Sequence, residues 1–78
     1  MAKVGIFEYK DWGTGSHSWG AIREDGVKME ITQMANNAWY VFFDDNGRWT
    51  QVKNGNYGAD FTTLRKAVKW CMDNFKFV

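Results

Sequence analysis

A six-residue apolar run, Ala-Trp-Tyr-Val-Phe-Phe at residues 38–43, is the only stretch in which both alternating faces of an extended strand are apolar. Successive side chains of a strand point to opposite sides of a sheet. One helical pattern is present, at the C-terminal end of the chain, and a single helix covers only one face of a small sheet. The second face of the sheet therefore needs another layer, a partner or a ligand.

Strand patterns alternate with turn residues along most of the chain. Asp25-Gly26 and Asn46-Gly47 are dipeptides that favour two-residue hairpin turns, and Asn36-Asn37 tolerates left-handed backbone. The sequence predicts four or five antiparallel strands in meander order. Their expected ranges are residues 3–10, 19–24, 27–32, 38–43 and 48–53, and residues 54–58 are expected to form a loop.

The two hairpin signals also predict strand registers. A two-residue turn at Asp25-Gly26 places Ile22 opposite Met29 and Gly20 opposite Ile31, so these residues would share the core face. Arg23, Lys28 and Glu30 would then share the solvated face.

The turn at Asn46-Gly47 places Val41 opposite Val52. Tyr40, Phe42 and Trp49 then lie together on one face, beside Gln51 and Lys53.

The length of the turn at residues 34–37 decides which face becomes the core. A two-residue turn at Asn36-Asn37 puts Phe42 on the face of Ile31, which then becomes the core face. The residues on the uncovered face are then Trp39, Val41, Phe43 and Val52. A bulge or longer turn gives the opposite arrangement, in which Tyr40, Phe42 and Trp49 are left over. Both alternatives leave one face with aromatic residues that the helix does not cover.

The apolar period changes to 3.6 residues near Phe61, which predicts a helix over residues 63–74 with Thr62 as its N-cap. Its apolar stripe contains Phe61, Leu64, Val68, Cys71 and Phe75, with Ala67 and Met72 at the flanks. Cys71 lies in the middle of this stripe and is expected to be a buried thiol. The predicted fold class is α+β, with the C-terminal helix packed on one face of the meander sheet.

The outer side of the predicted helix is basic, with Arg65, Lys66, Lys69 and Lys76. Trp70 falls between Lys66 and Lys69 by helical position. A tryptophan among basic residues is typical of interfaces, and it can also stack on a nucleobase. Packing of Trp70 beneath the glycine-rich loop or the first strand is the other interpretation.

The 78 residues are enough for one domain, spanning residues 1–78. The net charge of +1 argues against a highly acidic DNA mimic and indicates no strong attraction to nucleic acid. One cysteine cannot form an internal disulfide, and no apolar run reaches the ~18 residues of a membrane span. We therefore expect a cytoplasmic protein without a membrane segment.

Catalytic, cofactor and metal motifs are lacking, because the chain has one histidine, His17, and one cysteine, Cys71. Gly13-x-Gly15 has no following helical pattern that would make it a phosphate loop. The run 44–47 lacks the ligand spacing of a calcium loop and is expected to be a turn. We expect no enzymatic activity, no cofactor and no metal.

Two resemblances bear on function. The segment Phe61-Thr62-Thr63-Leu64-Arg65-Lys66-Ala67, preceded by two hairpins, loosely resembles AP2-type DNA-binding modules, a likeness that implies a sheet in contact with DNA. The proline-free, aromatic-rich chain also resembles the small accessory proteins of bacteriophages, which implies binding to one host protein in the host cytoplasm.

Three hypotheses follow. The first is a non-enzymatic protein-binding module, such as a phage-type inhibitor or adaptor, that uses an aromatic sheet face. The second is a nucleic-acid-binding protein in which the aromatic residues stack on bases and Lys or Arg meets phosphates. The third is a homodimer that closes its sheets against each other. The predicted partner-binding residues are Tyr40, Phe42, Trp49, Lys53, Lys66, Lys69 and Trp70.

Overall fold

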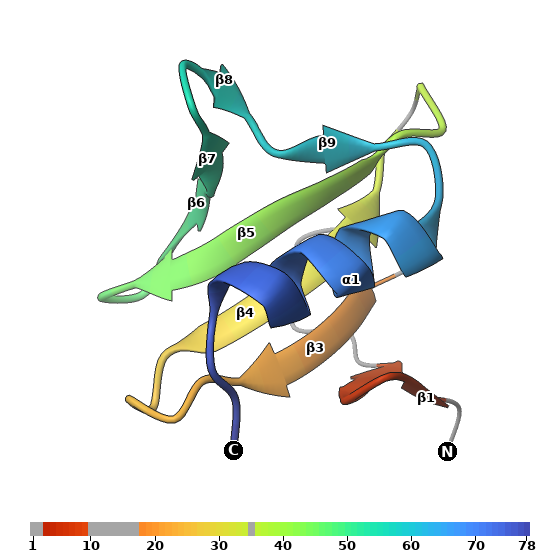
Figure 1. Ribbon diagram of the computed structural model, residues 1–78. Helices are drawn as coiled ribbons and strands as arrows, with labels where there is room; N and C mark the ends of the chain where they lie inside the picture. Colours follow the sequence, from red (N-terminus) through yellow and green to blue (C-terminus); the bar gives the residue numbers. More distant parts are fainter. Residues whose placement is uncertain (1–2, 10–17, 35) are drawn as a thin grey trace.

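The computed structural model describes residues 3–9, 18–34 and 36–78. Six antiparallel strands follow one another in meander order and form a curled sheet, and helix α1 lies across one of its faces (Figure 1). This arrangement confirms the predicted α+β class. The elements are β1 (Lys3–Val4), β2 (Phe7–Tyr9), β3 (Ser18–Ile22), β4 (Lys28–Gln33), β5 (Trp39–Asp45), β6 (Arg48–Gln51), β7 (Lys53–Asn54), β8 (Tyr57–Gly58), β9 (Asp60–Phe61) and α1 (Leu64–Asn74).

The single strand predicted over residues 3–10 is instead a hairpin of β1 and β2, in which Val4 pairs with Phe7. Gly5 has a φ of +59° at the first of the two turn residues, the conformation that a type II′ turn requires. This hairpin lies close to the helix. A Cβ atom at Gly5 would stand 3.0 Å from Sδ of Met72 and 3.0 Å from Cγ1 of Val68.

The predicted register of β3 against β4 is wrong by one residue, because the loop has three residues instead of two. Arg23 N–H donates to the Val27 carbonyl at 2.9 Å, and Gly26 adopts a φ of +89°, as in a turn with a bulge. Hydrogen bonding from Arg23 also lowers the pKa of the Asp25 carboxyl at the turn.

The shift reverses the faces of β3. Ala21 pairs with Met29 on the core face, whereas Ile22 pairs with Lys28 and is 45% exposed. Glu30, which was expected on a solvated face, pairs with Gly20 and is fully buried.

The turn between β4 and β5 is the longer of the two predicted alternatives, since Met34 N–H donates to the Ala38 carbonyl at 2.9 Å. Ile31 then pairs with Val41, and Met29 pairs with Phe43. Trp39, Val41 and Phe43 consequently share the face that the helix covers. Tyr40 and Phe42 occupy the opposite face.

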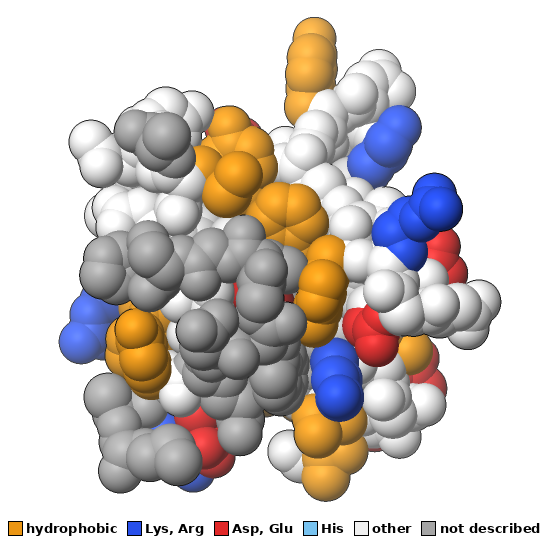
Figure 2. Space-filling view, turned by 180° about the vertical axis from the view of Figure 1, so that it is seen from behind, with side chains coloured by type: hydrophobic (Ala, Val, Ile, Leu, Met, Phe, Trp, Pro, Cys, Tyr) orange, Lys and Arg blue, Asp and Glu red, His pale blue; other side chains and the backbone are white. Residues whose placement is uncertain are grey.

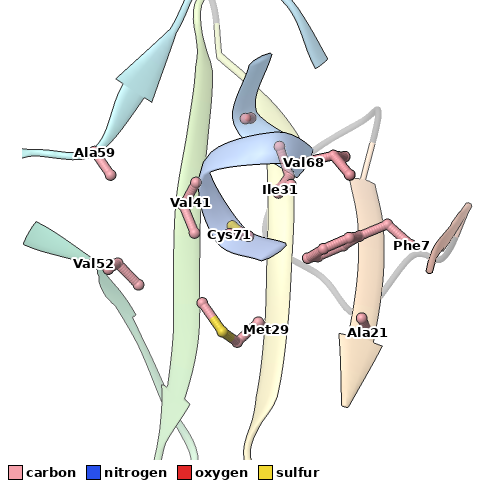
Figure 3. Close-up of a cluster of buried hydrophobic side chains, with 10 residues drawn as sticks. Phe7, Ala21, Met29, Ile31, Val41, Val52, Ala59, Val68 and Cys71 are labelled. Carbon is pink, nitrogen blue, oxygen red and sulfur yellow. The ribbon is translucent and has the colours of Figure 1, made fainter. Parts of the chain in front are cut away.

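The core lies between that face and α1 (Figure 3). The Cys71 side chain reaches from the helix towards Met29 and Val41. Cys71 is fully buried, as predicted, and burial raises its pKa to about 12. The buried apolar residues are Phe7, Ala21, Met29, Ile31, Val41, Val52, Ala59, Ala67, Val68 and Cys71.

The predicted register of β5 against β6 is confirmed: Phe42 pairs with Gln51, and Val52 N–H donates to the Val41 carbonyl at 2.8 Å. At Val41 the edge of β5 changes partner. Val41 N–H donates to the Ala59 carbonyl at 3.2 Å, and Ala59 N–H donates to the Val52 carbonyl at 2.7 Å. These three residues form a junction where β6 ends and β9 takes over as the neighbour of β5.

The β7–β8 hairpin leaves this junction and projects from the edge of the sheet (Figure 1). Lys53 pairs with Gly58, and Asn54 pairs with Tyr57. We expected a loop over residues 54–58. Instead the segment forms a short hairpin, because Gly55 has a φ of +70° as the first residue of a type II′ turn requires.

The helix begins one residue later than predicted. Its N-cap is Thr63, not Thr62, because the Thr63 hydroxyl accepts a hydrogen bond from Lys66 N–H at 3.2 Å.

Beyond the helix, residues 76–78 pair with residues 22–24, at the end of β3. Glu24 N–H donates to the Lys76 carbonyl at 3.0 Å, and Val78 N–H donates to the Ile22 carbonyl at 3.1 Å. The Phe77 ring packs on Phe7 with centroids 5.3 Å apart. The C-terminal segment therefore extends the sheet beside β2.

Candidate protein-interaction surface

The sheet face opposite the helix carries an aromatic cluster on β5 and β6. The Tyr40 and Phe42 rings lie on the same side of β5, with centroids 6.5 Å apart and planes inclined by 18°. Trp49 pairs with Asp44, one position further along the same side. All three aromatic side chains are half-buried. The aromatic cluster, defined here as Tyr40, Phe42 and Trp49, is thus assembled as the sequence predicted.

The same face is not uniformly apolar or open. Ser18, Glu30 and Thr32 occupy its central strands and are fully buried. The Ser18 and Thr32 hydroxyl oxygens are 3.3 Å apart, within hydrogen-bonding distance. Figure 2 shows this side of the molecule, with several hydrophobic side chains near the middle of the visible surface and Lys and Arg side chains scattered around them on both flanks. The aromatic cluster therefore belongs to the β5–β6 half of the face only.

Tyr57 extends the aromatic surface onto the β7–β8 hairpin. Its side chain is 80% exposed, whereas Phe42 and Trp49 are half-buried. Sequence reasoning missed Tyr57 as a site residue, because residues 54–58 were assigned to a connecting loop. The available signal was a lone aromatic residue flanked by Asn56 and Gly58, where no apolar period requires one.

A hollow of about 350 Å³ lies between the sheet and this hairpin. Its floor is set by Gly58, because a Cβ atom there would stand 2.4 Å from Cδ of Gln51. The Gln51 amide therefore lies directly over the glycine backbone, with Nε2 3.5 Å from the Ala59 carbonyl oxygen. The lining residues are Tyr40, Gln51, Tyr57, Gly58 and Asp60.

Two hydrogen bonds fix the far wall of this hollow. The Tyr40 hydroxyl accepts from Nδ2 of Asn36 at 3.1 Å, and Oδ1 of Asn36 accepts from Ala38 N–H at 3.1 Å. Asp60 pairs with Tyr40 across β5 and β9, so both side chains lie on the same face of the sheet. These hydrogen bonds within the protein therefore fix the position of the Tyr40 ring.

The predicted basic residues divide between two sides of the molecule. Lys53 is exposed at the start of β7, in the hairpin that projects from the β5–β6 edge of the sheet. Lys66 and Lys69 are exposed on α1, on the other side of the sheet. The Lys69 Nζ atom is 2.9 Å from a carboxylate oxygen of Asp73. The structure thus does not bring Lys66 and Lys69 together with the aromatic cluster.

Trp70 packs on other aromatic residues of the domain. Its ring centroid is 5.6 Å from that of Phe61 and 5.9 Å from that of Phe75, and the side chain is half-buried. Trp70 therefore packs onto the domain through Phe61 and Phe75, and its predicted packing beneath the glycine-rich loop or the first strand stays a prediction. Its part in partner binding stays a prediction.

The remaining sequence predictions concern chemistry. The Gly13-x-Gly15 element and His17 lie outside the described residues. Within the described ranges, no three His, Cys, Asp or Glu side chains gather as a metal site would need. The helix that the structure describes, α1, is too short and too polar to cross a membrane.

Comparisons with known proteins found no matching family model, no matching curated protein and no matching solved structure.

Proposed function

We propose that this chain is a non-enzymatic protein-binding module whose contact surface combines the aromatic cluster with Tyr57. The single observation that carries the proposal is the exposure of Tyr57, 80%, on a hairpin that projects beside half-buried aromatic side chains. Aromatic residues are enriched in the centres of protein interfaces, where a few of them supply most of the binding energy. A tyrosine that packs against little of its own domain is of limited use to the fold and well suited to a partner.

The charge pattern favours a protein over a nucleic acid as that partner. Lys66 and Lys69 lie on the far side of the sheet from the aromatic cluster, so one strand of nucleic acid on the cluster would not reach them. Phosphate neutralisation by several Lys or Arg side chains is the main source of affinity for nucleic acids. Asp44 and Asp60 lie beside the aromatic residues, and their carboxylates would repel the phosphates of a nucleic acid.

The test is affinity capture from lysate with and without nuclease treatment, read by mass spectrometry, with wild-type protein and three variants. Tyr57→Ala is the primary variant, because an 80% exposed side chain is removed at little cost to folding. Trp49→Ala removes the anchor of the cluster, and circular dichroism checks that this variant is folded. Met72→Ala, 46% exposed on the helix, is the control.

We expect proteins captured by the wild type and by Met72→Ala to be lost with Tyr57→Ala and Trp49→Ala. Loss of a central aromatic anchor costs about 2 kcal/mol or more, roughly 30-fold in affinity. An identical captured set for all four proteins would contradict the proposal. Capture that requires intact nucleic acid would favour the nucleic-acid hypothesis, and a solution mass of twice 9.1 kDa that Trp49→Ala halves would favour the homodimer. The cytoplasmic location and the phage-type role stay predictions.

A further inference from the structure

We infer that the hollow between Tyr40 and Tyr57 receives a basic side chain, arginine or lysine, from the protein partner. This inference rests on the proposed function and names the chemistry that the partner must offer. The hollow stands at the junction of the sheet and the projecting hairpin, beside the aromatic cluster, so a cation bound in it would be adjacent to the larger apolar contact.

The lining is rich in hydrogen-bond acceptors. Asp60 offers two carboxylate oxygens, and the Gln51 amide offers a carbonyl oxygen while its Nε2 is directed at the Ala59 carbonyl. No Lys, Arg or His lines the hollow among the described residues. A guanidinium or ammonium group carries donors only, so it complements this set.

Asp60 is available for such a contact. It is exposed, and it forms no ion pair with a described lysine or arginine. The nearest cation by strand position is Lys53, which is opposite Gly58 in the β7–β8 hairpin, is exposed and does not line the hollow. The acidic side chain therefore faces the hollow without a partner from within it.

The two tyrosine rings add a second attraction. A cation near the face of a tyrosine ring is held by the negative potential of that face. Tyr40 is anchored by Asn36, whereas Tyr57 stands on a short hairpin whose own strands pair only two residues each. A fixed wall and an exposed ring opposite it suit a side chain that enters from solvent.

The charge of the hollow argues against anionic occupants. Its volume of about 350 Å³, at the lower end of the ~300 to 1,000 Å³ typical of small-molecule sites, has room for one long side chain. The carboxylate of Asp60 repels phosphate, which disfavours a nucleotide. An extended basic segment of a protein also reaches Phe42 and Trp49 nearby, whereas a free cation does not.

The experiment is a titration of ¹⁵N-labelled protein with short peptides, followed by two-dimensional NMR at low salt. The probe is acetyl-Gly-Arg-Gly-amide, and its matched control is the same peptide with citrulline, the neutral isostere of arginine. Each peptide is added to the wild type, to Asp60→Asn and to Asp45→Asn. The last is a control with the same charge change at an exposed aspartate that does not line the hollow.

We expect saturable shifts at the amides of Tyr57, Gly58 and Asp60 with the arginine peptide, and binding about tenfold weaker with citrulline or with Asp60→Asn. Asp45→Asn should bind as the wild type does. Equal binding of the two peptides, unchanged binding by Asp60→Asn, or shifts outside the hollow would overturn the inference. Tighter binding of tetramethylammonium or of a thymidine oligonucleotide would overturn it in favour of a small cation or a nucleic acid.

The peptide titration and the capture experiment fail independently. If the arginine peptide does not bind but capture still depends on Tyr57 and Trp49, the inference is wrong and the proposed function stands. If the peptide binds and capture is insensitive to both residues, the proposed function is wrong.

Discussion

Replacing Gly5 with alanine should destabilise the fold more than the same change at any other turn glycine for which the structure gives a positive φ. The reason is that two penalties coincide at this position. The backbone has a φ of +59°, where an L residue pays about 1 kcal/mol. The added Cβ would also stand 3.0 Å from Sδ of Met72 and from Cγ1 of Val68, short of the ~3.5 to 4.0 Å at which such atoms attract.

Gly55 provides the matched control. It has a φ of +70° at the first turn residue of the β7–β8 hairpin, and an added Cβ meets no atom within 4 Å. Alanine at Gly55 therefore lowers the free energy of unfolding only through its backbone conformation. The lower conformational entropy of the unfolded Gly55→Ala chain offsets about 0.4 to 1 kcal/mol of that loss. Its net cost should be below about 1 kcal/mol. Overpacking adds about 1 to 3 kcal/mol at Gly5 to a net backbone cost below about 1 kcal/mol, so its total should be about 1 to 4 kcal/mol.

Urea unfolding followed by tryptophan fluorescence measures both variants. With an m-value near 1 kcal/mol/M for a chain of this size, Gly5→Ala should lower the midpoint by about 1 to 4 M, and Gly55→Ala by less than about 1 M. The m-value should stay constant, because the folded surface is unchanged. If the two variants lose the same free energy of unfolding within about 0.5 kcal/mol, the hairpin does not press on the helix as described.

Further variants test the core, the cap and the C-terminal segment. Cys71→Ser should cost about 1 to 3 kcal/mol, because it buries a hydroxyl among apolar groups. The buried Cys71 thiol, with its pKa near 12, ionises later than in the unfolded chain, so the wild-type free energy of unfolding should fall relative to Cys71→Ala between pH 9 and pH 12; parallel pH curves would show an accessible thiol. Thr63→Ala should cost about 1 kcal/mol by thermal unfolding, with Thr62→Ala nearly neutral, and the reverse order would restore Thr62 as the cap. Phe77→Ala should cost about 2 kcal/mol through its contact with Phe7, against no change for Val78→Ala, which removes an 88% exposed side chain.

The sequence was sufficient to predict the architecture, because the hairpin dipeptides, the apolar strand and the change of period each point to one local structure. The Val41–Val52 register followed from Asn46-Gly47, whose φ values of +54° and +90° suit a two-residue turn. The register at Asp25-Gly26 was wrong for a physical reason. Aspartate before glycine suits both a two-residue turn and a three-residue loop, so the dipeptide alone does not decide the register. The pairing of the C-terminal segment with the end of β3 does not indicate from the sequence which of the two turns forms.

The candidate site was predictable only in part. Tyr40, Phe42 and Trp49 share a face because strand alternation requires it. The burial of Glu30 and the exposure of Tyr57 depend on long-range packing, which alternation does not encode. Lys66 and Lys69 were grouped with the sheet residues by charge alone, and the helix carries them to the other side.

The three-way junction of Val41, Val52 and Ala59 has a consequence for how such a chain can evolve. The hydrogen bonds at Val52 and Ala59 fix both ends of the β7–β8 hairpin, and its two strands pair only with each other among the described residues. Changes at the exposed residues 53–57 should therefore leave the sheet and the helix intact, whereas a side chain at Gly58 would meet Gln51 of β6. Selection can thus exchange the tip that carries Tyr57 for another and redirect recognition, in the way that antibody loops vary on a constant framework.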